Sequence, residues 1–153
     1  MLRDGPAGTG MVQLWIDVDE QVDLVELVRS DHPALRRMAL FDAVVNNADR
    51  KGGHLLPVPG GHVHGVDHGV CFHEEPKLRT VLWGWRGTAL RPAEVEVLER
   101  LREGLRGDLG ATLHDLLTTR EVSATARRIR RLLEAGCFPE PSDDWPAVPW
   151  PPF

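Results

Sequence analysis

One polar stretch, residues 46–54, constrains this chain more than any other. It follows the apolar pattern of a helix end and reads Asn46-Asn47-Ala48-Asp49-Arg50-Lys51-Gly52-Gly53-His54. The stretch is predicted to be a loop that holds an acid and a base, Asp49 and Arg50, side by side. A second acid, Asp67, comes at the end of a strand-like run and is followed by Gly69. A β-hairpin between the two segments would bring Asp67 back beside the loop.

Length and composition favour one domain and exclude several classes of protein. The chain has 153 residues, 42% of them hydrophobic, which is enough for a single domain with a core. A net charge of −5 argues against non-specific nucleic-acid binding, which needs a basic face. No apolar run approaches the roughly 20 residues of a membrane span. The two cysteines fit no metal-finger or disulfide pattern and no signal peptide is recognisable, so a cytoplasmic setting is expected.

The elements before the loop are predicted from the spacing of apolar residues. The first ten residues are rich in glycine and are predicted to be a loop. A strand is expected over 11–18, where β-branched and apolar residues dominate. A short buried helix is predicted over 22–28. A longer helix is predicted from Pro33, whose missing N–H costs nothing in a first turn, to Asn46.

The segments after the loop are predicted to form a hairpin and then a helical region. The hairpin strands are expected over 54–57 and 61–67, on either side of a Val-Pro-Gly-Gly turn. Three helices are then predicted, over 92–107, 113–117 and 122–135. The expected fold class is therefore α+β, mostly helical with a central β-hairpin.

The loop and the hairpin carry the chemistry. Phosphoryl transfer to a hydroxyl or to water needs a carboxylate that orients the nucleophile and can accept its proton. It also needs side chains that hold one or two magnesium ions against the phosphates. Asp49 fits the first requirement and Asp67 the second. An Asp-Arg pair alone is usually a solvated surface ion pair, so the hypothesis depends on the whole string of residues.

That string, residues 41–73, resembles the catalytic core of the phosphatidylinositol kinases, especially the type II 4-kinases, and of the HipA-type kinases. The positions that carry the resemblance are Asp42, Asn47, Asp49-Arg50, His54 and Asp67-His68-Gly69. Over nearly its whole length, the chain resembles an actinobacterial phosphatidylinositol 3- and 4-kinase-like family. In that family the sequence Asn-Asn-Ala-Asp-Arg-Lys-Gly-Gly-His recurs.

The resemblance implies an ATP-dependent phosphotransferase that works with a divalent metal, Mg²⁺ or Mn²⁺. By the pattern of the family, Asp49 would be the catalytic base, with Asn47 and Arg50 as its catalytic neighbours. Asp67 would be the metal-binding acid. His54 stands where the pattern has a metal-binding Asn and would be the second metal ligand. An imidazole suits manganese, zinc or iron better than magnesium, which prefers oxygen ligands.

The resemblance also implies where the nucleotide binds. Residues 11–17 would form the hinge strand against which the adenine packs, with Gln13, Trp15 and Ile16 as cofactor-binding residues. The expected partners are a nucleotide and a phosphate acceptor, with no nucleic acid and no membrane span. Lipid, protein and small-molecule acceptors share this core, so the acceptor stays open, as does the oligomeric state.

Kinases place a Gly-rich loop and a phosphate-binding lysine in an N-terminal lobe before the hinge. The lysines here, Lys51 and Lys77, both follow the expected hinge. The resemblance therefore implies a protein-kinase-like C-terminal lobe that lacks its N-terminal lobe. Three parts are expected: an N-terminal loop with a hinge-like strand (1–20), the lobe (21–137) and a Pro/Trp-rich tail (138–153).

A cluster of histidines supports a different interpretation. Five of the seven histidines fall within twenty residues, at His54, His62, His64, His68 and His73. Two of them alternate on one face of the second hairpin strand, and Asp67 is close in sequence. Imidazole and carboxylate groups in this arrangement would suit a small metal-dependent hydrolase or a metal-binding module.

Two further features have a structural and a functional interpretation. The tail from Trp145 to Phe153 combines proline with aromatic residues, which grooves of partner proteins recognise. Docking of Trp145 and Trp150 on the domain's own surface is the favoured alternative. The arginines of residues 127–131 are expected to form a solvated helix face, with the gripping of phosphate or acidic lipid as the alternative.

Overall fold

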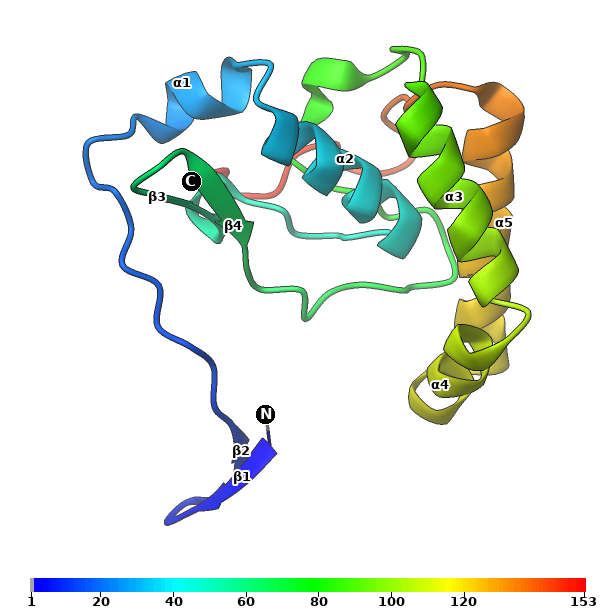
Figure 1. Cartoon of the computed structure of the whole chain (residues 1–153), viewed down its shortest axis with the longest axis horizontal. Helices are drawn as coiled ribbons and strands as arrows, with labels where there is room; N and C mark the ends of the chain where they lie inside the picture. Colours follow the sequence, from blue (N-terminus) through cyan, green and yellow to red (C-terminus); the bar gives the residue numbers. More distant parts are fainter. Residues whose placement is uncertain (1) are drawn as a thin grey trace.

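A computed structural model describes residues 2–153 as a mixed α+β fold that is mostly helical (Figure 1). The helices are α1 (Leu24–Arg29), α2 (Pro33–Val45), α3 (Pro92–Gly104), α4 (Asp108–Leu116) and α5 (Thr119–Ala135). Within these residues the strands form two antiparallel hairpins: β1 (Leu2–Gly5) with β2 (Gly8–Met11), and β3 (Leu55–Val58) with β4 (His62–Gly65). Short 3-10 turns lie at Gly52–His54 and Trp83–Trp85. The predicted α+β class, with its helical majority and a β-hairpin after α2, is confirmed.

The N-terminal segment differs from the prediction. The strand expected over 11–18 is wrong, because β2 ends at Met11 and residues 12–19 carry neither helix nor strand. The first ten residues, expected to be a loop, instead contribute the hairpin β1–β2, which lies away from the helices in Figure 1. Strand-forming residues need a partner strand to satisfy their backbone groups. The local hairpin supplies that partner only as far as Met11.

Helix α2 lies at the centre of the fold, and its ends explain its length. Pro33 occupies the first turn, where no N–H is required, and the His32 side chain accepts a hydrogen bond from the backbone of Ala34. The helix ends at Asn46, whose φ of 57° is left-handed, a conformation that asparagine adopts more readily than most residues. The helix predicted from Pro33 to Asn46 is confirmed. The short helix predicted over 22–28 forms as α1, but its expected burial is wrong, because none of its residues is buried.

The hairpin β3–β4 follows the polar loop. Val58 lies opposite His62 across its turn. The turn runs through Gly60 and Gly61 with φ values of 91° and 81°, which glycine adopts without a steric penalty. The two predicted strands are confirmed, with ends one or two residues from those expected.

Helices α3, α4 and α5 form the second half of the fold. Helix α3 begins at Pro92. A capping box starts α5: the Thr118 hydroxyl accepts a hydrogen bond from the backbone of Glu121, whose carboxylate accepts one from the backbone of Thr118. The same helix ends at Gly136, with a φ of 65°. The three predicted helices are confirmed, although the middle one starts earlier, at Asp108.

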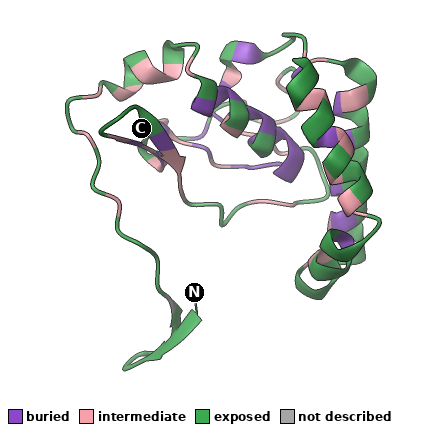
Figure 2. Cartoon of the chain, viewed as in Figure 1, coloured by how far each residue is buried: buried purple, intermediate pink, exposed green. Residues whose placement is uncertain are grey.

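Burial is greatest on α2 and on the inner side of α5 (Figure 2). The apolar core draws on α2, the hairpin, α3, α5 and the start of the tail, through Leu35, Leu40, Val44, Leu55, Val63, Leu98, Ile129, Leu132 and Phe138. Both halves of the fold are therefore packed around α2. None of the helices found between residues 2 and 153 is long and apolar enough to cross a membrane.

Candidate functional site

A buried guanidinium fixes the loop after α2 from the inside. The Arg50 side chain is 0% exposed, and its Nε and Nη2 donate to the two carboxylate oxygens of Asp42 at 2.9 Å each. Its Nη1 donates to the carbonyl oxygen of Val66 at 2.8 Å. Such a bidentate arginine–carboxylate pair is directional as well as strong. Arg50 therefore ties together α2, the loop and the segment that leaves β4.

Asn47 completes this buried network. Its Nδ2 donates to Asp42 at 3.0 Å, and its Oδ1 accepts a hydrogen bond from the backbone N–H of Asp49, also at 3.0 Å. Like Arg50, Asn47 is fully buried. Both residues were predicted to be catalytic. The structure places their side chains where they set the position of Asp49 and are enclosed by protein.

Asp49 itself is only partly buried and faces two cations. One carboxylate oxygen lies 3.0 Å from Lys51 Nζ and the other 3.6 Å from Arg79 Nη2. Arg79 also donates from Nε to the carbonyl oxygen of Ala48 at 2.7 Å. The alternative interpretation, a solvated surface pair between Asp49 and Arg50, is therefore wrong, because Arg50 pairs with the buried Asp42. Partly exposed pairs of this kind contribute about 0–1 kcal/mol, so the Asp49 carboxylate can exchange partners at low cost.

The two predicted metal ligands lie together. His54 Nε2 is 3.6 Å from a carboxylate oxygen of Asp67, whose side chain is 61% exposed. The other ring nitrogen, His54 Nδ1, is buried and has no hydrogen-bond partner among the described residues. The backbone supports this placement, since the N–H of Val66 donates to the carbonyl oxygen of His54 at 3.0 Å. The hairpin thus returns to the loop, as the sequence predicts.

The backbone of Asp67 has an unusual conformation at the point where the end of β4 meets the loop. Its φ of 54° is left-handed, which is uncommon for a residue with a side chain. The preceding carbonyl, that of Val66, is held by the Arg50 guanidinium. Arg50 follows Asp49 in sequence and Val66 precedes Asp67, so the immediate neighbours of the two acids are in direct contact. This contact joins the two acidic segments.

The five histidines do not converge on one site. Between residues 2 and 153, no group of three or more histidine, cysteine or acidic side chains is placed to share a metal ion. The rings of His62 and His64 contact each other edge to face, with 4.4 Å between ring centres. His68 packs against Phe41 with 5.3 Å between ring centres. Burial and the nearby Arg50 lower the pKa of His68. The clustering in sequence therefore does not produce a shared metal site among the described residues.

The predicted cofactor-binding residues are not brought to the loop. Gln13, Trp15 and Ile16 belong to the stretch 12–19 that runs from β2 toward α1 (Figure 1). Trp15 is 85% exposed. In the part of the chain that the structure describes, no hydrogen bond or ring contact joins these three residues to the loop.

The tail docks on the candidate site. The carbonyl oxygen of Pro152 accepts a hydrogen bond from the N–H of Gly52 at 2.7 Å. A Cβ on Gly52 would stand only 2.1 Å from the ring of Phe153, so the ring lies directly on the glycine backbone. The Trp145 ring lies beneath Lys77, 5.0 Å from Nζ, and beside Arg79. Docking on the domain's own surface is confirmed for Trp145.

Trp150 behaves differently from Trp145, because its side chain is 87% exposed. The tail is also held at Ala147, whose carbonyl oxygen accepts hydrogen bonds from Thr80 N–H at 3.0 Å and Trp83 Nε1 at 2.7 Å. Aromatic anchoring was visible in the sequence, but the carbonyl contacts were not. Every residue has a backbone carbonyl group, so a sequence does not show which of them accepts a tertiary hydrogen bond.

Two residues of the site were missed as functional candidates. Asp42 lies on the buried face of α2, and an acid on an apolar helix face signals a buried partner. That signal could have identified the pair with Arg50. Arg79 connects Asp49 with the tail residue Trp145. Nothing in its sequence neighbourhood marks this position.

A mycobacterial protein is similar to the chain over its full length. The chain is 39% identical over 188 residues to Protein Rv2133c of Mycobacterium tuberculosis, and the match covers all of this chain and 67% of that protein. The chain belongs to the family of that protein. No family model matches the chain, and no solved structure matches it. The name of the relative states no activity, so the kinase part of the resemblance stays a prediction.

Proposed function

We propose that this chain is a kinase-like phosphotransferase of the phosphatidylinositol 3-/4-kinase-like type that uses ATP and a divalent metal. The observation that carries the proposal is the buried Arg50 guanidinium, which binds both Asp42 and the carbonyl oxygen of Val66. Phosphoryl transfer is catalysed mainly by positioning and by electrostatic stabilisation. A buried tether between the Asp49 loop and the Asp67 segment serves such positioning.

Asp49 is the proposed base. Its backbone N–H is held by Asn47, while its carboxylate stays partly exposed, as a base that has to meet an acceptor hydroxyl requires. Lys51 and Arg79 add two positive charges beside it. Cations at this position would stabilise the negative charge that develops on a transferred phosphoryl group. The acceptor could be a lipid, a protein or a small molecule.

Asp67 and His54 are the proposed metal ligands, and their geometry fits one cation. Two ligand atoms that each lie about 2.1 Å from one metal stand roughly 3–4 Å apart, and His54 Nε2 lies 3.6 Å from the Asp67 carboxylate. Mg²⁺ commonly takes one or two protein carboxylates together with phosphate oxygens, so two protein ligands suffice. The imidazole favours Mn²⁺ over Mg²⁺. A bound divalent cation would neutralise charge on the phosphates.

The adenine contacts of Gln13, Trp15 and Ile16 stay a prediction. Their segment lies away from the loop in this structure, so the proposal depends on the loop and the hairpin alone. In kinases an N-terminal lobe covers the nucleotide phosphates, and such a lobe would complete the site. Asp49, Asp67 and His54 are therefore the residues on which the proposal is tested.

The test compares nucleotide binding with turnover. Mn²⁺ and ATP together are expected to raise the melting temperature of the unaltered chain, and release of ADP measures turnover. Asp67→Asn should abolish the metal-dependent shift. Asp49→Asn should keep the shift and lower turnover by about 10²–10⁴-fold, the usual contribution of a general base.

Asp115→Asn is the matched control, because Asp115 is an exposed acid on α4 that has no ion pair in the described part of the chain. It should change neither binding nor turnover. Three results would contradict the proposal: no metal-dependent shift in the unaltered chain, an unchanged shift in Asp67→Asn, or unchanged turnover in Asp49→Asn.

A further inference from the structure

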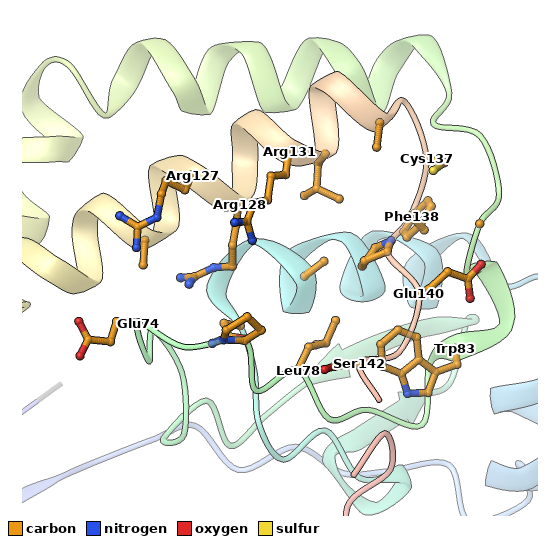
Figure 3. Close-up of a pocket in the computed structure, with 18 residues that line it drawn as sticks. Glu74, Leu78, Trp83, Arg127, Arg128, Arg131, Cys137, Phe138, Glu140 and Ser142 are labelled. Carbon is orange, nitrogen blue, oxygen red and sulfur yellow. The ribbon is translucent and has the colours of Figure 1, made fainter. Parts of the chain in front are cut away.

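A cavity of about 490 Å³ lies between α2, α5, the segment 74–78 and the start of the tail (Figure 3). Neither Asp49 nor Asp67 lines it. Its volume falls within the range of small-molecule binding sites, roughly 300–1,000 Å³. The cavity is therefore a concave site that lies apart from the proposed phosphotransfer residues.

The walls of the cavity differ in character from one end to the other. The apolar part is formed by Ala43, Leu78, Trp83, Ala124, Leu132 and Phe138. Figure 3 shows Trp83 and Phe138 toward one end and Arg127 and Arg128 toward the other, with Arg131 pointing inward from α5 between them. A cavity with an apolar end and a basic end suits an amphiphilic ligand that has an apolar part and an anionic group.

The three arginines of this wall have no acidic partner. No carboxylate lies within 4.0 Å of Arg127, Arg128 or Arg131 among residues 2–153, whereas their neighbour Arg130 pairs with Glu134 at 3.6 Å. Arg127 and Arg131 are exposed, but Arg128 is half-buried, and a positive charge that is partly removed from water without a counter-charge is unfavourable. An anion bound in the cavity would relieve this cost.

Arg128 is the most constrained of the three. Its guanidinium donates to the carbonyl oxygens of Val44 and His73 and to the hydroxyl of Thr125, all neutral acceptors. Burial and the adjacent Arg127 lower the pKa of Arg128 to about 10, so it stays charged at neutral pH. The structure thus holds this charge in place at the cavity wall.

Two carboxylates lie at the rim of the cavity. Glu74 and Glu140 are exposed, and Glu140 is 4.0 Å from Arg86, outside the cavity. Three arginines and two glutamates leave one positive charge among the lining residues. This balance favours a ligand with a single negative charge over a doubly charged phosphate monoester.

We propose that this cavity binds a small amphiphilic monocarboxylate, with its carboxylate against the arginines of α5 and its apolar body toward Trp83 and Phe138. Guanidinium groups bind carboxylates through paired, charge-assisted hydrogen bonds, which are stronger than neutral ones. The aromatic side chains would cover the apolar body and provide most of the buried area. This site is independent of the proposed phosphotransfer activity.

Calorimetric titration with decanoate, below the concentration at which it aggregates, tests the proposal, and decanol is the uncharged probe of equal length. Decanoate should bind with one site per chain and at least about tenfold more tightly than decanol, since a hydrogen bond to a charged group contributes that much. Arg127→Gln and Arg131→Gln should each weaken decanoate by about tenfold and leave decanol unchanged.

Two further variants locate the ligand. Arg130→Gln is the matched control, because it removes the same charge from the same helix outside the cavity, and it should leave binding unchanged. Ala135→Phe adds volume at an exposed lining position and should weaken both probes. An unshifted melting temperature shows that each variant stays folded. The proposal is overturned if neither probe binds, if both bind alike, or if Arg130→Gln weakens decanoate as much as Arg131→Gln.

Discussion

The loop region, residues 42–67, and the helical region, residues 92–135, bury different kinds of side chain. Besides aliphatic residues such as Leu55 and Val63, the loop region encloses an arginine, an aspartate and two asparagines, whereas the buried polar side chain of the helical region is Thr125, among aliphatic residues such as Leu98 and Ile129. Aliphatic packing stabilises the fold without fixing the orientation of any one side chain, because the hydrophobic effect depends on the apolar area that is buried. A hydrogen-bonded pair such as Arg50 with Asp42 specifies one partner at one place. Both regions therefore contribute to stability, and the loop region adds a buried directional pair that fixes side chains in place.

The largest expected effect comes from breaking the buried pair of the loop region. Asp42→Asn leaves the Arg50 guanidinium buried without a counter-charge, which should lower the free energy of unfolding by about 3–5 kcal/mol. Urea denaturation measures this loss. A loss below about 1 kcal/mol, the level of a surface pair, would show that the network does not hold the loop.

A paired replacement separates positioning from stability. Asp42→Leu combined with Arg50→Met should recover much of the lost stability, since apolar residues of similar volume often replace a buried ion pair without loss. The hydrogen bond to Val66 is then absent, so the Mn²⁺- and ATP-dependent shift in melting temperature should not return. If both the free energy of unfolding and the Mn²⁺- and ATP-dependent shift returned, the buried pair would stabilise the fold without positioning the site.

Leu98→Ala tests the helical region in the same way. Leu98 is fully buried in α3, and its truncation should lower the free energy of unfolding by about 2–5 kcal/mol. Amide hydrogen exchange should then become faster in α3 and α5, while the amides of Asp49 and Arg50 keep their protection. Equal loss of protection in both regions would show that they unfold together.

The contact between loop and tail is expected to have a smaller effect. Gly52→Ala places a methyl group into the ring of Phe153 and should destabilise the fold by about 1–3 kcal/mol, as overpacking usually does. Phe153→Ala should relieve most of that loss when the two changes are combined. A double-mutant cycle from thermal unfolding measures the coupling, and additive losses would contradict the contact.

The pair between α2 and α3 gives the smallest effect and depends on pH. Arg36 donates to both carboxylate oxygens of Glu94, at 2.6 and 2.8 Å. Burial alone would raise the pKa of Glu94, but hydrogen bonds from Arg36 and from the backbone of Arg91 outweigh it, and the pKa is lowered. The folded state therefore binds this proton less readily than the unfolded chain does.

The stability from Glu94 is accordingly present above the ordinary pKa of a glutamate, about 4.3, and is lost as the pH falls through the lower pKa of the folded state. Glu94→Gln should reduce the stability at pH 7 and flatten its decline between about pH 5 and pH 3. Urea denaturation at several pH values measures both. An unchanged slope in Glu94→Gln would assign the acid sensitivity to other carboxylates.

The same contrast explains what the sequence could predict. Helices α2, α3 and α5 were predictable because Pro33, Pro92 and Gly136 mark their ends and apolar spacing marks their faces. The hairpin was predictable from its glycine turn. These signals are local, so each can be read from a few neighbouring residues.

The remaining features depend on distant partners. Arg50 was predicted to be a catalytic neighbour of Asp49, but its guanidinium binds Asp42 and a carbonyl oxygen sixteen residues away. The docking of Phe153 on Gly52 links residues about a hundred positions apart. No periodicity encodes such contacts. The candidate acids could therefore be named from the sequence, whereas most of the contacts that hold them in place could not, the exception being Asp42, whose place on an apolar helix face indicates a buried partner.

The position of Phe153 bears on how the protein is handled in the laboratory. Because its ring rests on the backbone of Gly52, a purification tag joined after it would emerge beside the polar loop that carries Asp49 and Lys51. A tag at the opposite end would sit near the outlying hairpin β1–β2, away from α2 (Figure 1). Tests of the proposed activity are best made with the second arrangement.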